Sequence, residues 1–406
     1  MAYLPPHKRH SSGGSDPAPP TSSLGSLSIS SSAPRGRHLL RPSSNKIIHA
    51  AGCVSRWSPL PPFSPDSDDA DSFRLEPFAC EPVERKTGSK PFVLSLSSPE
   101  ASSCSSAEAA AAIADRFLPE LLAAAERATH HVSPDNEESE VVKLSLVARV
   151  GKVLFQRGGS HVSLDSLREA AKAGNEGSKS KVRKSFYTNV PKECSEDMER
   201  SVVKLMGLEF DSSKEHYHVK IFDKHRSDSI STMSCKCTLQ QDGKLAIHKV
   251  ELDTIRQLVE DISCLSQDLD LRLMLRTKRI LKNLDPEVEN AIQSLVSSAI
   301  LDPNVKGALR WPLGKESIGE RFSLVGVWHT NYKAFRNKTL RFKLRHSDWF
   351  DHRSSTREVS NEVSFKLIGI SNRLQDGNKE VDSVKEMLEC DVRMIWDSAL
   401  CYKMVH

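Results

Sequence analysis

Apolar and polar residues alternate along much of this chain, and a period of two predicts β-strands. Residues 340–345 show it clearly, because leucine and phenylalanine alternate there with arginine and lysine. The same alternation, or an excess of β-branched and aromatic residues, predicts strands over 46–57, 73–84, 91–98, 141–155, 216–222, 233–239, 244–252, 255–265, 269–277, 322–329, 339–346 and 362–370. The Asp-Gly pair at 242–243 predicts a hairpin turn between two of these strands.

Helical periodicity occupies the intervals between these strands. Apolar residues recur at helical spacing over 106–130, 163–174, 195–206, 286–300 and 381–399. The first of these segments is rich in alanine, and Pro119 is expected to kink it or to start a second helix there. Pro286 stands in the first turn of another helix, where proline is tolerated.

These elements predict an α+β fold in which antiparallel sheets, built as meanders, are covered by helices. Residues 1–45 are rich in Ser, Pro and Gly and are expected to form a disordered tail. An N-terminal α+β domain is expected over 46–173 and a basic linker over 174–190. A C-terminal α+β domain is expected over 191–406, and 284–305 is a candidate joint between two subunits of it.

The chain has 406 residues and a formal net charge of +4, and the tail carries the positive excess. Residues 1–50 contain a single acid, Asp16, against Lys8, Arg9, Arg35, Arg37, Arg41 and Lys46. The sequence shows neither a secretory signal nor an apolar run of about 18 residues that would predict a membrane span. Nine cysteines, an odd and scattered set, indicate reduced thiols. A cytoplasmic or nuclear location is therefore expected, and organelle targeting is the less favoured interpretation.

The strongest candidate for binding chemistry is the acid-free run over 332–346. On a strand its cations would line one face about 6.6 Å apart, a spacing suited to the phosphates of an extended nucleic-acid strand. The competing and slightly favoured interpretation is a solvated face whose cations pair with acids on a neighbouring strand. A similar pattern recurs near residue 272, so the candidate phosphate-binding residues are Lys333, Arg336, Lys338, Arg341, Lys343, Arg345, Arg272 and Arg276.

Other constellations favour ordinary structural roles. His216 and His218 with Cys235 and Cys237 lack the usual zinc-ligand spacing, so no metal is expected. Residues 307–315 resemble a phosphate loop only superficially, and Trp311 is expected to be a packed loop corner. No complete catalytic motif occurs and no cofactor is expected, so a non-enzymatic protein is the favoured interpretation.

Several irregular segments resemble a family of uncharacterised plant proteins that begin MAYxPPHKRH and carry a domain of unknown function. The resemblance includes the opening MAYLPPHKRH and, most specifically, the segment DPNVKGALRWPLGK at 302–315. It extends through much of the chain and implies one shared architecture, but it implies no catalytic residues.

The opening residues also resemble the Tyr-Ile-Pro-Pro-His-Leu-Arg element in the tails of cytoplasmic DEAD-box RNA helicases, which is linked to the translation cap-binding protein. Lys8 stands here where that element has leucine. Two prolines preset an extended backbone and so lower the ordering cost of docking. The candidate docking residues for a protein partner are Tyr3, Pro5, Pro6, His7 and Arg9.

The sequence thus predicts a non-enzymatic RNA- or protein-binding factor of RNA metabolism or translation. One alternative is an enzyme that acts on a phosphorylated small molecule and gathers Trp311, Lys315 and several arginines in a deep pocket. A second alternative is a scaffold that binds proteins only. The oligomeric state is left open.

Overall fold

The computed structural model describes residues 48–63, 72–97, 104–130, 140–157, 162–172, 182–226, 232–377 and 380–400. The helices are α1 (Glu81–Thr87), α2 (Ser106–His130), α3 (Leu164–Lys172), α4 (Lys192–Leu205), α5 (Pro286–Ser297), α6 (Ile368–Gln375) and α7 (Val381–Ile395), with a 3-10 turn at Lys306–Ala308 and a π-helical segment at Trp396–Leu400. The strands are β1 (Ile48–Leu60), β2 (Phe73–Pro77), β3 (Phe92–Leu96), β4 (Glu140–Arg157), β5 (Val182–Tyr187), β6 (Glu209–Asp223), β7 (Thr232–Leu239), β8 (Leu245–Leu252), β9 (Ile255–Cys264), β10 (Asp270–Leu281), β11 (Ile300–Leu301), β12 (Leu309–Arg310), β13 (Ser317–Ile318), β14 (Phe322–Arg336), β15 (Leu340–Asp351) and β16 (Thr356–Leu367). The tail expected over 1–45 lies outside the described residues.

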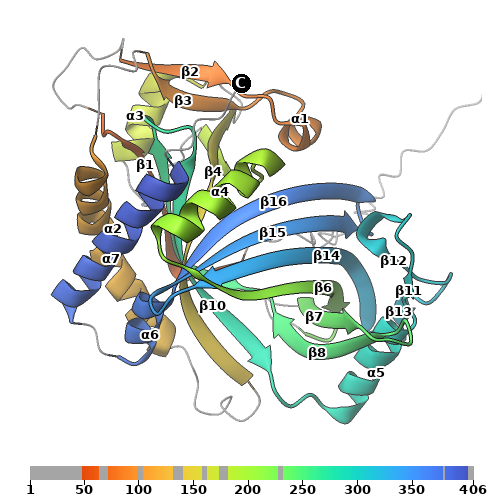
Figure 1. Cartoon of the computed structure of the whole chain (residues 1–406). Coiled ribbons are helices and arrows are strands. Elements are labelled where there is room, and N and C mark those ends of the chain that lie inside the picture. The colour runs from red at the N-terminus through yellow and green to blue at the C-terminus, as the bar shows by residue number, and fades with distance from the viewer. Residues whose placement is uncertain are drawn as a thin grey trace, which may run out of the picture. The chain divides into compact units, whose positions relative to one another are not determined.

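Eight strands close into an antiparallel barrel, in the order β4, β10, β8, β7, β6, β14, β15, β16 and back to β4. Pairing between β10 and β4 joins the two ends of the sheet, and it runs from Asp270 opposite Gly151 to Leu281 opposite Glu140. The long curved strands β6, β14, β15 and β16 form much of the wall (Figure 1). Closure leaves each barrel strand with one face inside and one outside.

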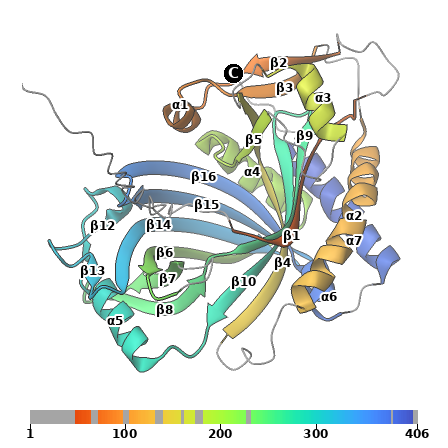
Figure 2. The same ribbon diagram turned by 180° about the vertical axis from the view of Figure 1, so that it is seen from behind.

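The remaining strands extend the sheet beyond the barrel. The strand β9 pairs with the first part of β10, and β1 lies parallel to β9. The far part of β4 pairs with β5 and, at Phe155, with β3, which pairs with β2. These strands gather with α1 and α3 away from the barrel (Figure 2).

The boundary expected at 174–190 does not separate two sheets. The strand β4, from the expected N-terminal domain, pairs with β10 and β16 from the expected C-terminal domain, and residues 43–406 form one compact unit. Part of the expected linker is β5, which pairs with β4. At the candidate joint over 284–305, α5 packs on the outside of the barrel.

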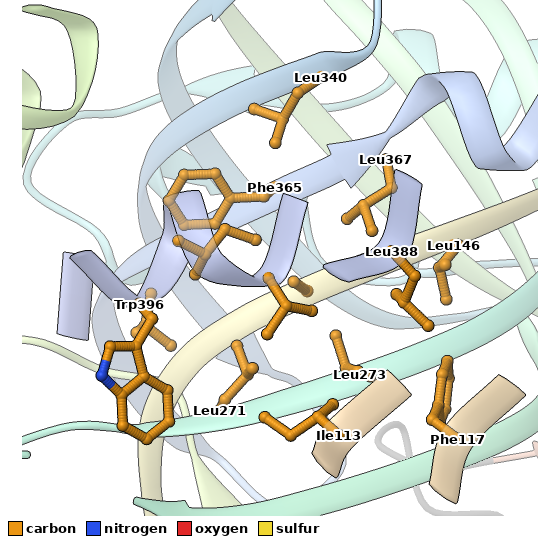
Figure 3. Packing of buried hydrophobic residues seen from close by; sticks show 14 of the residues in the cluster. Ile113, Phe117, Leu146, Leu271, Leu273, Leu340, Phe365, Leu367, Leu388 and Trp396 are labelled. Atoms are coloured by element: carbon orange, nitrogen blue, oxygen red, sulfur yellow. The ribbon is translucent and has the colours of Figure 1, made fainter. Parts of the chain in front are cut away.

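The largest core lies on the outer face of the barrel and is covered by α2, α4, α6 and α7. In Figure 3 the apolar side chains of the strands meet those of the helices, among them Leu146, Leu271, Leu273, Leu340, Phe365, Leu367, Ile113, Phe117, Leu388 and Trp396. The helices α2 and α7 lie side by side in both overall views. This packing confirms the expected α+β class, with helices on antiparallel strands.

Pro119 lies inside α2. It does not start a second helix, one of the two outcomes expected from the sequence, since α2 runs without interruption from Ser106 to His130. Alanines on the buried stripe, such as Ala110, Ala114 and Ala125, present little side-chain volume to the neighbouring elements. Tertiary packing along this stripe therefore overrides the local cost of the proline.

A second core lies under α5. Ile292, Leu295 and Val296 of this helix pack on the outward residues of β6, β7, β8 and β14. Among the described helices, none is both long and apolar enough to cross a membrane.

Candidate anion-binding lumen

The interior of the barrel, which we call the lumen, receives the charged face of β15. Leu340 and Phe342 are fully buried in the outer core. Because side chains alternate along a strand, Arg341, Lys343 and Arg345 face the opposite side, into the lumen. The alternation expected from the sequence is present, but the face is enclosed by a barrel instead of lying open to solvent.

Neighbouring strands place more cations on this inner surface. Opposite residues of antiparallel strands share a face, and the strand register therefore identifies the inward positions. This register places many cations on the inner face, and we call ten of them the lumen cations: Arg149, Lys220, Lys236, Lys249, Arg276, Lys278, Arg341, Lys343, Arg345 and Lys366. Seven different strands contribute to this set.

Two carboxylates, Glu251 and Glu362, form ion pairs with several of these cations. Glu251 ion-pairs with Lys236 at 3.2 Å, Lys249 at 2.5 Å and Lys278 at 3.7 Å. Burial alone would raise its pKa, but Lys278, Lys236 and Lys249 together lower the pKa of Glu251 to about 2. One carboxylate therefore serves three ammonium groups.

Glu362 has the same role for two arginines. It ion-pairs with Arg345, and its Oε2 lies 3.8 Å from Arg149. Burial opposes ionisation, yet Arg345 and then Arg149 lower the pKa of Glu362 to about 2. Elsewhere in the lumen, Asp253 binds Lys220 at 3.0 Å, and Asp211 binds Arg341 at 2.6 Å.

Other lumen cations lack such a partner. Among the described residues, neither Lys343 nor Arg276 has a carboxylate oxygen within 4.0 Å of its charged nitrogens. The Lys343 ammonium lies 3.4 Å from the centroid of the Tyr332 ring, and the Arg276 Nε is buried without a hydrogen-bond partner. The lumen thus contains cations that the protein itself does not neutralise.

The pKa values report the same imbalance. Burial, followed by repulsion from Arg345, lowers the pKa of Lys343 to about 6. Burial and the adjacent Arg276 lower the pKa of Lys278 to about 7, and burial with repulsion from Arg149 lowers the pKa of Arg276 to about 9. An anion bound among these groups would offset the repulsion and raise their pKa values.

The structure places the eight phosphate-binding candidates in three different settings. Four of them line the lumen: Arg276, Arg341, Lys343 and Arg345. Arg272 instead forms a bidentate ion pair with Asp261 and lies over the Phe186 ring at 4.6 Å. The other three are exposed: Lys333 binds Glu199, Arg336 binds Asp211 at the barrel end, and Lys338 lies in the turn before β15.

Sequence reasoning missed most of the lumen, including Arg149, Lys236, Lys278 and the two carboxylates. Part of the signal was present, because Lys249 and Glu251 of β8 alternate with apolar residues, and Arg276 and Lys278 of β10 stand two residues apart on a strand. Such pairs indicate a charged face, but they do not show that the sheet closes around it.

The two His and Cys pairs face opposite sides of the wall. His216 and His218 point into the lumen, whereas Cys235 and Cys237 are buried in the core under α5. In the described part of the chain, no three His, Cys, Asp or Glu residues cluster closely enough to hold a metal ion.

The loop at 302–319 lies outside the barrel. Trp311 is buried in the core under α5 and donates its indole N–H to the Leu295 carbonyl at 2.9 Å. A cavity of about 430 Å³ beside it is lined by Lys306, Arg310 and His352, together with neighbouring apolar residues, and by none of the lumen cations. The cavity beside Trp311 therefore does not gather the candidate arginines that were expected there. The docking candidates Tyr3 to Arg9 lie outside the described residues.

Comparison with solved structures finds distant likenesses. The Pct1 RNA triphosphatase of S. pombe, in complex with the Spt5 CTD, is 8% identical, with 64% of this chain and 85% of that chain covered and a TM-score of 0.36. The PH1012 protein of Pyrococcus horikoshii is 12% identical, covering 50% and 86%, with a TM-score of 0.22. A putative adenylate cyclase of Bacillus halodurans is 12% identical, covering 49% and 87%, with a TM-score of 0.20. At this level of similarity none of them assigns an activity to this chain.

No curated protein matches the sequence. A family model does match, over residues 41–399, and it therefore spans the barrel, the outer helices and the additional strands. The chain belongs to the family described as a domain of unknown function, DUF7903.

Proposed function

We propose that this protein binds an anion with several phosphate groups inside the barrel. The observation that carries the proposal is the enclosed excess of basic side chains, above all Lys343 and Arg276, neither of which has a carboxylate oxygen of the described residues within 4.0 Å. Unpaired buried charges are costly, and a protein retains them where a ligand supplies the missing partner. Phosphate oxygens accept strong, charge-assisted hydrogen bonds from both arginine and lysine.

The geometry favours a compact ligand over an extended strand. An eight-stranded barrel has room inside for side chains and one small ligand. Arg341, Lys343 and Arg345 curve with the wall, so they do not present the open face on which an RNA backbone was expected to lie. An RNA end that carries several phosphates is still compatible with this chemistry. The protein partner proposed for the N-terminal tail does not depend on the lumen.

A titration with inorganic tripolyphosphate tests the proposal. We expect the full chain to bind it at low salt and to lose affinity as salt increases. Replacing Arg276 with glutamine should weaken binding about 10- to 100-fold, since hydrogen bonds to charged groups contribute about 1.5–3 kcal/mol. Isothermal titration calorimetry measures both effects.

The matched control is Lys338→Gln, which removes a cation from the exposed turn outside the lumen and should leave the affinity unchanged. Absence of binding, or equal losses in the two variants, would contradict an anion site in the lumen. Assay of the same samples for released orthophosphate separates a binding protein from the enzymatic alternative.

Binding should also be linked to protonation. The pKa of Lys343 is about 6 and that of Lys278 about 7, so both are mostly neutral at pH 7.5 in the free protein. A bound anion favours their charged forms, and the complex should therefore take up protons. The wild type should take up more protons per tripolyphosphate than a Lys343→Met variant, measured by calorimetry in buffers of different ionisation enthalpy. Equal uptake by the two proteins would show that Lys343 does not change charge on binding.

A further inference from the structure

Two tryptophans lie on the inner surface of the barrel, next to the cations. Trp328 of β14 is opposite Trp349 of β15, and their rings stack with centroids 5.7 Å apart and an interplanar angle of 27°. Both side chains are only half-buried, and neither belongs to a described apolar core. The Trp349 indole N–H is buried without a hydrogen-bond partner. The Lys220 ammonium lies 6.0 Å from the centroid of the Trp328 ring, so a basic group and an aromatic surface already meet at this point of the inner wall.

The aromatic pair and the cations follow one another along a single strand pair. From the tryptophans the inner face continues through Thr330 opposite Ser347 to Tyr332 opposite Arg345. Two such steps along a strand span roughly 13 Å. That distance suits a ligand with a flat ring system at one end and charged groups at the other.

A cavity connects the two regions. It has a volume of about 210 Å³, and its lining includes Trp328, Thr330, Arg345, His218 and Lys220 together with the carboxylates of Glu251 and Asp253. Trp328 supplies an aromatic wall, while His218, whose pKa burial lowers well below its ordinary value, supplies a neutral polar one. Arg345 and Lys220 bring positive charge to the same space.

From this arrangement we infer that the ligand is a nucleotide, with its base against Trp328 and its phosphates on Arg345 and the lumen cations beyond it. The inference rests on the proposed function, because the phosphates are held by the site described there. Every nucleobase has a flat π-face, and stacking on an aromatic side chain contributes appreciably to the affinity for a base. An inorganic phosphate chain would leave the tryptophan surface unused.

The test compares a nucleoside triphosphate, ATP or GTP, with inorganic tripolyphosphate on the full chain. The wild type should bind at least one of the nucleotides about tenfold more tightly than tripolyphosphate, the gain expected from one stacked base. A Trp328→Leu variant should lose this tenfold advantage and keep its tripolyphosphate affinity. Trp328→Phe should retain part of the advantage and shows whether an aromatic ring is what matters.

The matched control is His329→Ala. His329 is adjacent to Trp328 but faces outward, where it stacks on Tyr217 at 4.8 Å, so its removal should not change the preference for nucleotides. Equal binding of tripolyphosphate and both nucleotides by the wild type would overturn the nucleotide assignment and leave the phosphate site standing. Failure to bind any of the three ligands would overturn both proposals. If Trp328→Leu fails to fold by circular dichroism, the wild-type comparison and the Phe variant still decide the question.

Discussion

Replacing Glu362 with glutamine is expected to lower the free energy of unfolding by about 3–5 kcal/mol, the range for breaking a buried ion pair from one side. The change preserves shape and removes only charge. It leaves Arg345 of β15 and Arg149 of β4, on the two strands that flank β16, without the carboxylate that now lies between them. Arginine does not release its proton in the physiological range, so the repulsion has no simple relief. Urea denaturation at pH 7 measures the loss.

Glu251 provides an informative comparison. It serves three lysines, yet Glu251→Gln should cost less, because Lys278 has a pKa of about 7 and can lose its proton when its counter-ion is removed. A surface control is Glu199→Gln, which breaks the exposed pair with Lys333 and should cost less than about 1 kcal/mol. A loss at Glu362 as small as that at Glu199 would mean that the lumen is well hydrated and that its charges interact weakly.

Local patterns predicted most of the individual elements. The alternation over 340–345 correctly separated the core-facing residues of β15 from its cations, and the alanine-rich periodicity located α2. Both patterns depend only on which neighbours share a face, which is a property of the strand or helix itself.

The enclosure of the cations was not predictable in the same way. It depends on β4 pairing with both β10 and β16, which are distant in the sequence, and no residue pattern in β4 specifies those partners. An open sheet and a closed barrel have the same period of two along each strand. The sequence therefore placed the cations near residue 343 on one face of a strand. It did not identify which strands lie beside them, or which acids on those strands pair with them.

The proposed binding of an anion also explains why the lumen has more basic than acidic side chains. A site that held enough carboxylates to neutralise every cation would be more stable when empty and would bind an anion less tightly. Proteins commonly trade stability for function in this way. Removing one basic side chain from the lumen should therefore stabilise the empty protein and weaken anion binding. Both effects should be largest at Lys343.

Lys343→Met should therefore raise the free energy of unfolding by about 2 kcal/mol at pH 7, since burying the amine of Lys343 is costly and forces it to lose its proton in the folded protein. The same variant should bind tripolyphosphate at least about tenfold more weakly, because it lacks a charge-assisted contact. Methionine retains the length of the side chain and its contact with the Tyr332 ring. Urea denaturation and calorimetry on the same preparations measure the two effects.

The pH dependence of the free energy of unfolding provides a second test of whether Lys343→Met is stabilising. In the folded protein the pKa of Lys343 is about 6, against an ordinary value of 10.5, so between these values the unfolded chain binds more protons than the folded one. Wild-type stability should consequently rise with pH across this window relative to the variant. The advantage of Lys343→Met should be greatest near pH 6 and should disappear toward pH 10.5. A variant that is less stable than the wild type throughout this range would show that Lys343 is already compensated by other groups in the free protein and does not require a bound anion.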